Sequence, residues 1–380
     1  MKIALLRERH EGERRIALAP KECATLIGAG LSIRMEAGAG SPASLPDGAY
    51  ADTGVEVVPN AEAAVAGART IVAVRWPQLI GSGALPDALE SGWPEEALFV
   101  SLFGFSPPPF EVIARRGGSV LALEHLPRIT RAQSMDVLSS QATAAGYAAS
   151  LRVATHLPRF LPMLTTASGT VAPARILVLG AGVAGLQAIA TARRLGAAVT
   201  GYDIRPAALE QIRSLGAKSL EMPAEGEDAE GEGGYGQALP EDAQERQQTF
   251  LARAAADFDA IITTAQIPGR PAPLLLTREA VEAMRPGSII VDLAGDSGGN
   301  CALSKAGRTL EIGGVTVDAP LNLASEVALN ASEMFGKNIT ALLRHLGVAD
   351  GEIRLDPGDE ITGSLLRVHR GQKRGEGWES

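Results

Sequence analysis

A short apolar run that passes through three glycines into a helix is the feature that most constrains the fold. Residues 175–185 read Arg-Ile-Leu-Val-Leu-Gly-Ala-Gly-Val-Ala-Gly, so Gly180, Gly182 and Gly185 form the pattern G-x-G-x-x-G. In such a unit the first glycine makes the tight turn, the second lets a pyrophosphate approach the backbone, and the third lets helix and strand pack closely. The helix N-terminus then offers N–H groups to phosphate. The segment therefore predicts a dinucleotide-binding α/β domain.

A carboxylate follows at the distance where such a domain binds ribose. Asp203 ends the next predicted strand, 18 residues after Gly185, and a carboxylate there accepts hydrogen bonds from the ribose hydroxyls. It would also repel a 2'-phosphate at close range, which favours NAD over NADP. Arg205 is able to neutralise a phosphate, but beside Asp203 we expect a solvated or pyrophosphate-facing guanidinium.

Short β-branched runs alternate with helical stretches along the chain, which is typical of parallel sheets covered by helices. The N-terminal region has predicted strands at 2–6, 32–36, 55–58, 70–75, 97–103 and 119–123, and predicted helices at 20–28, 61–66 and 110–115. The region after it has predicted strands at 175–179, 198–202, 260–264, 288–293 and 315–317. We expect an α/β fold of two Rossmann-like domains, with the cofactor in the cleft between them.

Two long helices are expected to connect these domains. Residues 134–155 are rich in Ala and Ser and contain no Pro, so they predict one long helix. A helix over 324–346 should return the chain to the first domain, because no third core is visible. The expected domains are 1–140 with 325–380, and 141–324.

One acidic loop carries the whole net charge of −9, which comes from 44 acidic and 35 basic side chains. Residues 221–245 contain nine carboxylates and no Lys or Arg, so the remainder is balanced. Five glycines lie in 224–239, and we expect a mobile surface loop with a function, the alternative being a merely solvated insertion. This charge pattern argues against binding to nucleic acid.

Several other classes of protein, among them disulfide-rich, metal-binding and membrane-spanning proteins, are disfavoured by the sequence. Cys23 and Cys301 lie far apart without a CxxC motif, which argues against a disulfide framework or structural zinc and suggests a reducing compartment. Asp292 and Asp296 lack partner ligands at metal spacing, so we predict no metal site there, but a strand end and turn. We expect no signal peptide and no membrane span, and hence a cytoplasmic chain.

A second polar cluster lies where the first domain gives way to the long helix. Arg128, Gln133, Asp136 and Ser139 offer a cation, an amide, a carboxylate and a hydroxyl, and Asp136 and Ser139 share a helix face. A ligand site at the domain seam is one interpretation. The other is helix capping by Ser134 with Asp136 in the first turn, and spacing alone does not decide between them.

Motifs spread along the chain carry a family resemblance. The discriminating ones are Arg-x-x-Arg-x-Gln-Ser-Met-Asp-x-Leu-Ser-Ser over 128–140 and Gly-Gly-Asn-Cys over 298–301. The further matches are 13–20, 180–185, 202–205, 233–235, 267–273, 284–288 and Asn338. In these the chain resembles the family that includes alanine dehydrogenase and the NAD(H)-binding component of proton-translocating nicotinamide nucleotide transhydrogenase, and it is more similar to the transhydrogenase branch.

The resemblance implies hydride transfer from NADH to NADP held on a separate component, coupled to proton movement through a membrane-spanning proton-channel component. It also implies a homodimer, peripheral on the inner face of a bacterial membrane through its partner subunits. Arg128, Gln133, Asp136 and Ser139 would surround the nicotinamide, and the loop with Tyr235 would close over the site. The residues that it assigns to cofactor binding are Arg131, Gly180, Gly182, Val183, Gly185, Asp203, Ile204, Arg205, Gly234, Tyr235, Gln247 and Gln266. At Gln266 the chain departs from its relatives, which usually carry an aliphatic residue after Thr-Thr-Ala.

The chemistry of hydride exchange between two nicotinamide rings fits these residue types, because it requires positioning and no general base. We expect Gln133 to orient the carboxamide, Arg128 to anchor the ring, and Asp136 with Ser139 to support both.

An alanine dehydrogenase-like enzyme is the first alternative, and it would need a catalytic Lys and His. Where that branch has its Lys, in a Val-Lys-x-Pro stretch, the chain has Arg75, which stays protonated. No His lies at 103–106, where that branch would have its catalytic histidine, and His125 is expected to be structural. A non-catalytic NAD-binding regulatory module is the second alternative.

Overall fold

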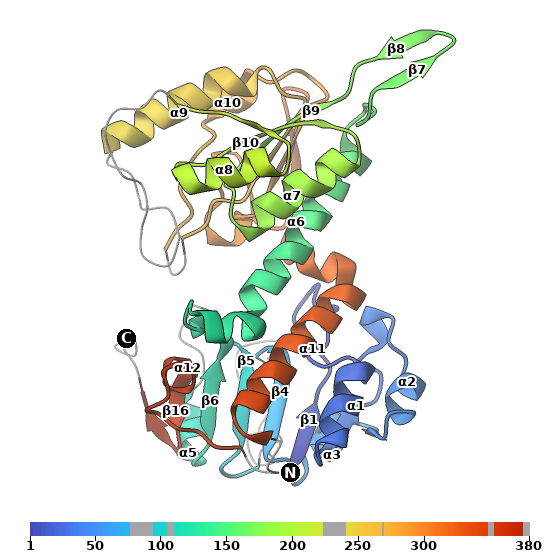
Figure 1. The fold of residues 1–380 in the computed structure, drawn as a ribbon, viewed down its shortest axis with the longest axis vertical. Helices are drawn as coiled ribbons and strands as arrows, with labels where there is room; N and C mark the ends of the chain where they lie inside the picture. The colour runs from blue at the N-terminus through green and yellow to red at the C-terminus, as the bar shows by residue number, and fades with distance from the viewer. Residues whose placement is uncertain (77–93, 105–109, 223–240, 268–269, 349–352, 375–380) are drawn as a thin grey trace. The chain divides into compact units, whose positions relative to one another are not determined.

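The protein divides into two compact units, Met1–Gln141 with Ser325–Ser380 and Ala142–Ala324. The computed structural model describes residues 1–76, 94–104, 110–222, 241–267, 270–348 and 353–374. Each unit is built on one predominantly parallel sheet covered by helices (Figure 1). The division of the chain falls within helix α6 (Val137–His156), which therefore contributes residues to both units.

Unit 1 contains an eight-stranded sheet in the order β17-β16-β6-β5-β4-β1-β2-β3. The strands from β6 to β3 pair in parallel, and the last two along the chain pair antiparallel at one edge. Their bounds are β1 Lys2–Leu5, β2 Ser32–Glu36, β3 Glu56–Val58, β4 Thr70–Arg75, β5 Leu98–Leu102, β6 Ser119–Ala122, β16 Leu366–His369 and β17 Gln372–Lys373.

The helices of unit 1 cover both faces of this sheet. The α-helices are α1 Pro20–Gly28, α2 Asp47–Ala51, α3 Ala61–Val65, α5 Phe110–Arg115, α11 Ala328–His345 and α12 Glu360–Leu365. Short 3-10 helices in the described part of this unit are η1 Ser41–Ala43, η2 Leu123–His125 and η3 Thr130–Met135, and η6 Leu323–Val327 spans the boundary with unit 2. Successive residues of β1 enter different apolar clusters, Ile3 and Leu5 with α1 and α11, Ala4 with α3 and α5. This alternation buries both faces, as in other parallel sheets.

Unit 2 contains a seven-stranded sheet in the order β11-β10-β9-β12-β13-β15-β14, with β14 antiparallel to its neighbour. Its strands are β9 Arg175–Leu179, β10 Ala198–Tyr202, β11 Lys218–Ser219, β12 Ala260–Thr263, β13 Ile289–Asp292, β14 Arg308–Ile312 and β15 Val315–Ala319. Its helices are α7 Val183–Arg194, α8 Pro206–Ser214, α9 Glu241–Ala255, α10 Arg278–Glu282 and η5 Gly295–Ser297. A separate hairpin, β7 Leu164–Thr166 and β8 Gly169–Val171, projects from this unit (Figure 1).

The strand orders create one topological switch point in each sheet. In unit 2 the chain builds outward from β9 on one side and from β12 on the other. In unit 1 the corresponding pair is β1 and β4. Ligands of open α/β sheets bind in the crevice beyond the carboxyl ends of such a pair, so these two places are the first to search for a site.

The predicted strands of the sequence agree with the observed ones to within two residues at each end, but other elements differ. The helix expected over 134–155 begins at Val137, because residues 130–135 form a separate 3-10 helix. The sequence did not predict α2, the β7–β8 hairpin, or the edge strands β11, β14, β16 and β17. Residues 223–240 of the acidic loop expected over 221–245 lie outside the described residues, and residues 241–245 form the start of helix α9 rather than part of a loop.

Gly146 lets α6 approach α7, because a Cβ at this position would overlap the carbonyl oxygen of Ala184. We therefore expect Gly146→Ala to lower the free energy of unfolding of unit 2 by about 1–3 kcal/mol, the cost of overpacking a core contact. Gly28→Ala is the control, since a Cβ there meets no atom within 4 Å. Urea-induced unfolding measures both variants, and equal stability of the two would contradict this packing.

Candidate functional site

The turn after β9 is shaped by its glycines. Gly180 has a φ of 94°, in the region that favours glycine, and a Cβ on Gly185 would overlap the carbonyl oxygen of Gly180. The first turn of α7 therefore packs directly on the end of the strand. Gly182 is the N-cap residue of α7, and the N–H groups of a helix's first turn lack intrahelical acceptors. The arrangement places these donors at the switch point of unit 2.

The face of this turn at Gly182 is open. A Cβ on Gly182 would meet no protein atom within 4 Å, in contrast to the crowded positions of Gly180 and Gly185. The neighbouring Val183 is 43% exposed, although it begins a helix with a buried face. The space beside Gly182 is thus available to a phosphate group at a helix N-terminus.

Asp203 lies beside this turn, directly after β10. Its Oδ2 accepts a hydrogen bond of 2.7 Å from the Ala181 N–H, and both carboxylate oxygens bind the Arg205 side chain. Burial alone would raise the pKa of Asp203, but the hydrogen bonds from Arg205 and Ala181 outweigh it and lower the pKa. Asp203 is therefore a charged, oriented acceptor at neutral pH.

For Arg205 the sequence left open a solvated or a pyrophosphate-facing guanidinium. Its side chain is only 16% exposed and forms a 2.9 Å ion pair with Asp203, so the first of these is wrong, and the second stays a prediction. The backbone N–H of Arg205 also donates to Asp203 Oδ1 over 2.9 Å. The Arg205 backbone and side chain thus both bind the carboxylate of Asp203, a local arrangement that the sequence alone did not predict.

Gln247 and Ile204 support this strand end from the interior. Gln247 lies on α9, is buried, and donates over 2.9 Å to the hydroxyl of Tyr202. Ile204 is partly buried against the apolar cluster that contains Leu179. Their described contacts are with the protein core, so whether either touches a cofactor stays a prediction.

The loop after β12 forms the opposite side of the switch point. Thr264 donates its hydroxyl to the Gly180 carbonyl over 2.9 Å, joining the two strand ends. Asn300 is fully buried and binds both the N–H and the carbonyl of Ala265, at 3.0 and 2.8 Å. Gln266 is exposed and donates to the Leu293 carbonyl over 3.1 Å. Gln266, the residue at which the chain differs from the family pattern, therefore lies at the surface of this loop.

Asp292 organises the chain behind that loop. Its buried carboxylate accepts from the hydroxyls of Thr263 and Ser304 and from the N–H groups of Ala294, Asn300 and Cys301. The residue thus belongs to a strand end and turn, and in the part of the chain that the structure describes no acidic or His/Cys cluster has metal geometry. Thr264, Asp292 and Asn300 were missed from the sequence as site residues, although the Gly-Gly-Asn-Cys motif includes Asn300.

The polar cluster of unit 1 is only partly assembled. Asp136 accepts from the N–H and the hydroxyl of Ser139, at 2.9 and 2.5 Å, so Asp136 caps α6. The alternative of a Ser134 cap is wrong, because Ser134 lies inside η3. Gln133 on η3 and Arg128 before it are exposed.

Two further contacts tether the η3 segment within unit 1. Asn338 of α11 donates to the Ser134 carbonyl over 2.8 Å. Arg131 lies 3.5 Å from Glu360 in an exposed ion pair, which contributes little to stability in solvent. Arg131 therefore contacts its own unit in this structure, and its contact with a cofactor stays a prediction.

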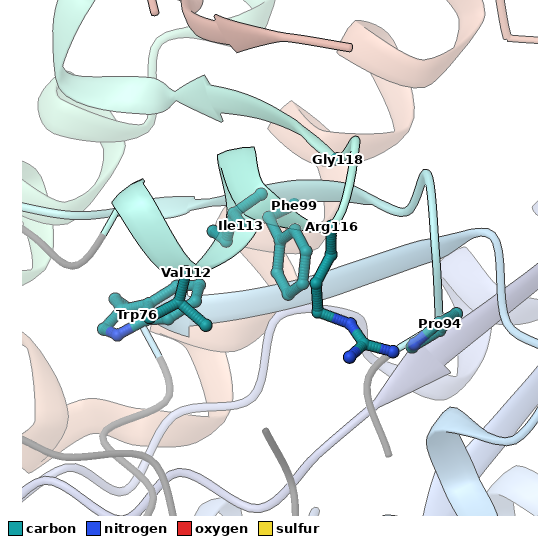
Figure 2. Close-up of a pocket in the computed structure, with 7 residues that line it drawn as sticks. All are labelled: Trp76, Pro94, Phe99, Val112, Ile113, Arg116 and Gly118. Atoms are coloured by element: carbon teal, nitrogen blue, oxygen red, sulfur yellow. The ribbon is translucent and has the colours of Figure 1, made fainter. Parts of the chain in front are cut away.

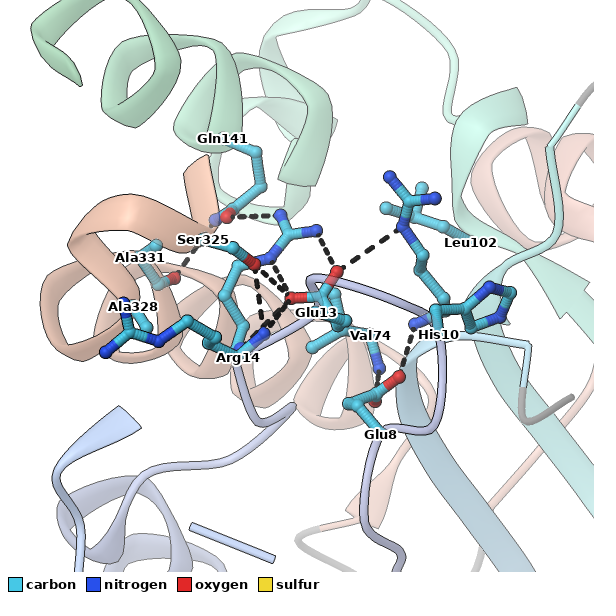
Figure 3. A network of polar contacts seen from close by, with 12 residues as sticks. Glu8, His10, Glu13, Arg14, Val74, Leu102, Gln141, Ser325, Ala328 and Ala331 are labelled. Carbon is cyan, nitrogen blue, oxygen red and sulfur yellow. Dashed lines mark hydrogen bonds and ion pairs between the residues drawn. The ribbon is translucent and has the colours of Figure 1, made fainter. Parts of the chain in front are cut away.

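A buried charged network lies at the switch point of unit 1 (Figure 3). Glu13 binds Arg15 through both carboxylate oxygens, at 2.8 and 2.6 Å, and Arg75 Nε lies 3.4 Å from Glu13. Glu8 accepts from the Val74 N–H over 2.6 Å at the end of β4. Burial, and then repulsion from Glu13, raises the pKa of Glu8 to about 8.

Two more titratable groups follow β6. Glu124 accepts a 3.0 Å hydrogen bond from the Phe103 N–H, and burial raises its pKa to about 7. Burial, assisted by the positive charge of Arg367, lowers the pKa of His125 to about 4. His125 is therefore neutral at physiological pH, as expected for a structural histidine and not for a general acid.

A small, almost entirely apolar cavity in unit 1 contains none of the predicted site residues (Figure 2). It is lined by Trp76, Pro94, Phe99, Val112, Ile113, Arg116 and Gly118. Gly234 and Tyr235 of the acidic loop lie outside the described residues.

Comparisons with known proteins place these features in a family. The model of the alanine dehydrogenase/PNT N-terminal domain matches residues 4–145, and that of the C-terminal domain matches 149–376. The chain is 38% identical to NAD(P) transhydrogenase subunit alpha of Cereibacter sphaeroides, over 98% of this chain and 70% of the relative. A transhydrogenase crystal structure from Sinorhizobium meliloti matches with 39% identity and a TM-score of 0.84, covering 98% of this chain and all of that one. Alanine dehydrogenase of Mycolicibacterium smegmatis is more distant, at 26% identity over 79% of this chain and 74% of the relative.

Because Gly182 has open space beside it and Gly185 does not, alanine substitutions at these two positions should affect ligand binding and folding separately. We expect Gly182→Ala to keep the unfolding midpoint and to weaken NADH binding at least tenfold, about 1.4 kcal/mol, by displacing the pyrophosphate. Gly185→Ala should instead lower the unfolding midpoint, because its Cβ overlaps the Gly180 carbonyl. Fluorescence titration with NADH and thermal unfolding measure the two effects. Normal NADH affinity in a folded Gly182→Ala variant would exclude this turn as the pyrophosphate site.

Proposed function

The chain belongs to the alanine dehydrogenase/PNT family, and on that premise we propose that it is the NAD(H)-binding component of a proton-translocating transhydrogenase. It passes hydride from NADH directly to NADP+ held on a partner component. The observation that carries this proposal is the open Gly182 turn beside charged Asp203, on a chain similar to a transhydrogenase subunit over nearly its whole length.

The cofactor of the family is a nicotinamide dinucleotide, and we propose NAD(H) for this chain. The residues present fit that group. The N-terminus of α7 with the space beside Gly182 would hold the pyrophosphate, and the ionised Asp203 would accept ribose hydroxyls and repel a 2'-phosphate. Arg205 neutralises Asp203 in the structure, so ribose binding would rearrange or share this pair.

The proposed reaction needs position and orientation from the protein. The reduced nicotinamide, when bound, supplies the hydride. Hydride exchange between two nicotinamide rings transfers no proton, so no general acid or base is required. We propose that Gln133 hydrogen-bonds the carboxamide and that Arg128 anchors the ring, while the Asp136–Ser139 pair holds the start of α6. Exposure of Gln133 and Arg128 supports a role toward a ligand rather than in the core.

The properties of Arg75 and His125 disfavour an amino acid dehydrogenase that uses these two positions. Arg75 replaces the lysine of that branch, stays protonated, and binds the carboxylate of Glu13. His125 is neutral, with a pKa near 4. Amino acid oxidation needs a group that exchanges protons near neutral pH, and neither residue meets this need.

The chain is similar to a subunit and acts with partner components. We propose that these are an NADP(H)-binding component and a membrane-spanning proton-channel component, which would hold the chain peripherally on the inner face of a bacterial membrane. Among the described residues, no helix combines the length and apolar character needed to cross a bilayer.

We also propose a homodimer, and the β7–β8 hairpin supports it. Phe160, Met163 and Val171, at and beside this hairpin, are 60%, 63% and 41% exposed. A two-stranded hairpin is marginally stable by itself, and such apolar side chains are typical of an interface. We expect Met163→Asp to shift the protein toward monomer in analytical ultracentrifugation, whereas a dimer unchanged by the substitution would exclude this hairpin as the contact.

The proposed role of Gln133 is tested by single-turnover hydride transfer to an added NADP-binding component. We expect Gln133→Ala to slow transfer about tenfold to a hundredfold at saturating NADH, because a misplaced ring loses near-attack geometry. Lys21→Ala is the control, since Lys21 is exposed on α1. Equal rates in the two variants would contradict ring positioning by Gln133.

Two further measurements distinguish the proposed function from an alanine dehydrogenase and from a regulatory module. Reduction of pyruvate with ammonium by the protein alone would support an alanine dehydrogenase. Binding of NADH without transfer to any NADP-binding component would support a regulatory module.

A further inference from the structure

A network of polar side chains around Glu13 in unit 1 is explained neither by the stability of the fold nor by the chemistry of hydride transfer alone. We define it as Glu13, Arg15, Arg75, Gln141 and Ser325 (Figure 3). The Glu13 and Arg15 side chains are 0% and 4% exposed. Replacing a buried ion pair by apolar residues is often neutral or stabilising, so a buried pair calls for an explanation other than stability.

Glu13 acts as a fixed anchor for Arg15. Its Oε1 accepts from the Arg15 backbone N–H and Nε, at 3.0 and 2.8 Å, and from the Ser325 hydroxyl at 2.5 Å. Burial opposes ionisation, but the bonds and charge of Arg15 outweigh it and lower the pKa of Glu13 to about 2. The carboxylate stays ionised at working pH, and it orients the guanidinium through two parallel bonds.

Arg15 connects Glu13 to helix α6. Its Nη1 donates to Gln141 Oε1 over 2.8 Å, while its Nη2 donates to Glu13. The Gln141 amide group then donates to the Ala331 carbonyl of α11 and to the Ser140 hydroxyl, at 3.0 and 3.1 Å. Gln141 is thus bonded at both ends of its amide, and it fixes the second turn of α6.

The same turn of α6 leads back to Gln133. The Ser140 N–H bonds to the Asp136 carbonyl, and the Asp136 carboxylate caps the helix through Ser139. The Asp136 N–H lies 3.4 Å from the Gln133 carbonyl. A continuous set of hydrogen bonds therefore joins Glu13 to the segment that presents Gln133.

We propose that Arg15 is a positioning residue for hydride transfer, which acts through Gln141 to hold the η3–α6 junction and hence Gln133. This inference rests on the proposed function. In this proposal the buried Glu13–Arg15 pair fixes the position of the η3–α6 junction, and Arg15 itself does not touch the reacting atoms. A fork-shaped cation is needed because Glu13 and Gln141 are bound simultaneously from different nitrogens.

Arg15→Lys and Gln141→Met remove the same link from its two sides. Lysine keeps a positive charge for Glu13 but has one nitrogen, and methionine fills the volume of Gln141 without its amide. We expect each variant to slow single-turnover hydride transfer about tenfold to a hundredfold while NADH affinity stays unchanged. The double variant should be no slower than the single ones, because both act through one link.

Hydrogen–deuterium exchange gives a readout that does not depend on activity. We expect the peptide over 130–141 to exchange faster in Arg15→Lys and in Gln141→Met than in the unmodified protein, since local opening of the junction becomes easier. If Arg15→Lys fails to fold, Gln141→Met tests the same link without disturbing the charge pair.

Arg152→Lys is the matched control. Arg152 lies on the same helix and binds buried Asp318 at 2.7 and 3.3 Å, within unit 2. The Arg152→Lys variant should keep the charge opposite Asp318 but lose one of these two hydrogen bonds, without altering transfer or exchange at 130–141. Equal slowing by Arg152→Lys, multiplicative effects in the double variant, or a folded Arg15→Lys with normal transfer and exchange would each overturn the proposal.

The proposed function fails separately, if the unmodified protein transfers no hydride to an NADP-binding component. In that case hydrogen exchange over 130–141 still decides whether Arg15 holds the junction, and unchanged exchange would exclude it.

Discussion

The close approach of α7 to the end of β9 is the constraint on which the proposed nucleotide site depends. Only the absence of a side chain at Gly185 lets the first helical turn lie against the Gly180 carbonyl. Thr264 then joins that carbonyl to the end of β12, and Asp203 accepts from the Ala181 N–H. The turn, the neighbouring strand and Asp203, the proposed ribose acceptor, are thus held in one arrangement before any ligand binds, which reduces the ordering that binding must provide.

The two switch points carry different chemistry. In unit 2 the polar groups are backbone donors and one ionised acceptor beside an open glycine, which suits a phosphate and a sugar. In unit 1 the corresponding place contains the chain's own carboxylate, Glu13, neutralised by Arg15 and approached by Arg75. Such a network stiffens the start of α6, and its carboxylate Glu13 is held ionised by Arg15 and is not poised to exchange protons with a substrate amine. This division agrees with a protein that positions a ring and leaves proton chemistry to other components.

The sequence predicted the elements whose signal is local. Apolar runs bounded by turns located the parallel strands, and glycine spacing located the strand–turn–helix unit of β9 and α7, because each depends on neighbours in the chain. Short edge strands such as β11 and β17 have only two residues, too few for a pattern. The Asp203–Arg205 pair and the Arg15–Gln141 bond depend on rotamers and on residues up to 126 positions apart, so spacing could not reveal them. Capping of α6 by Asp136 instead of Ser134 was likewise settled by backbone geometry.

We propose that the chain holds NADH for direct transfer of hydride to a second nicotinamide, a step that needs no general acid or base. An isotope-transfer experiment tests this proposal. NADH deuterated at the transferred position is mixed with the protein and an NADP-binding component, and the NADPH formed is examined by mass spectrometry. The account predicts that the deuterium is retained in full in NADPH, in ordinary water. Loss of the label to solvent, or its appearance in alanine when pyruvate and ammonium are supplied, would contradict the account.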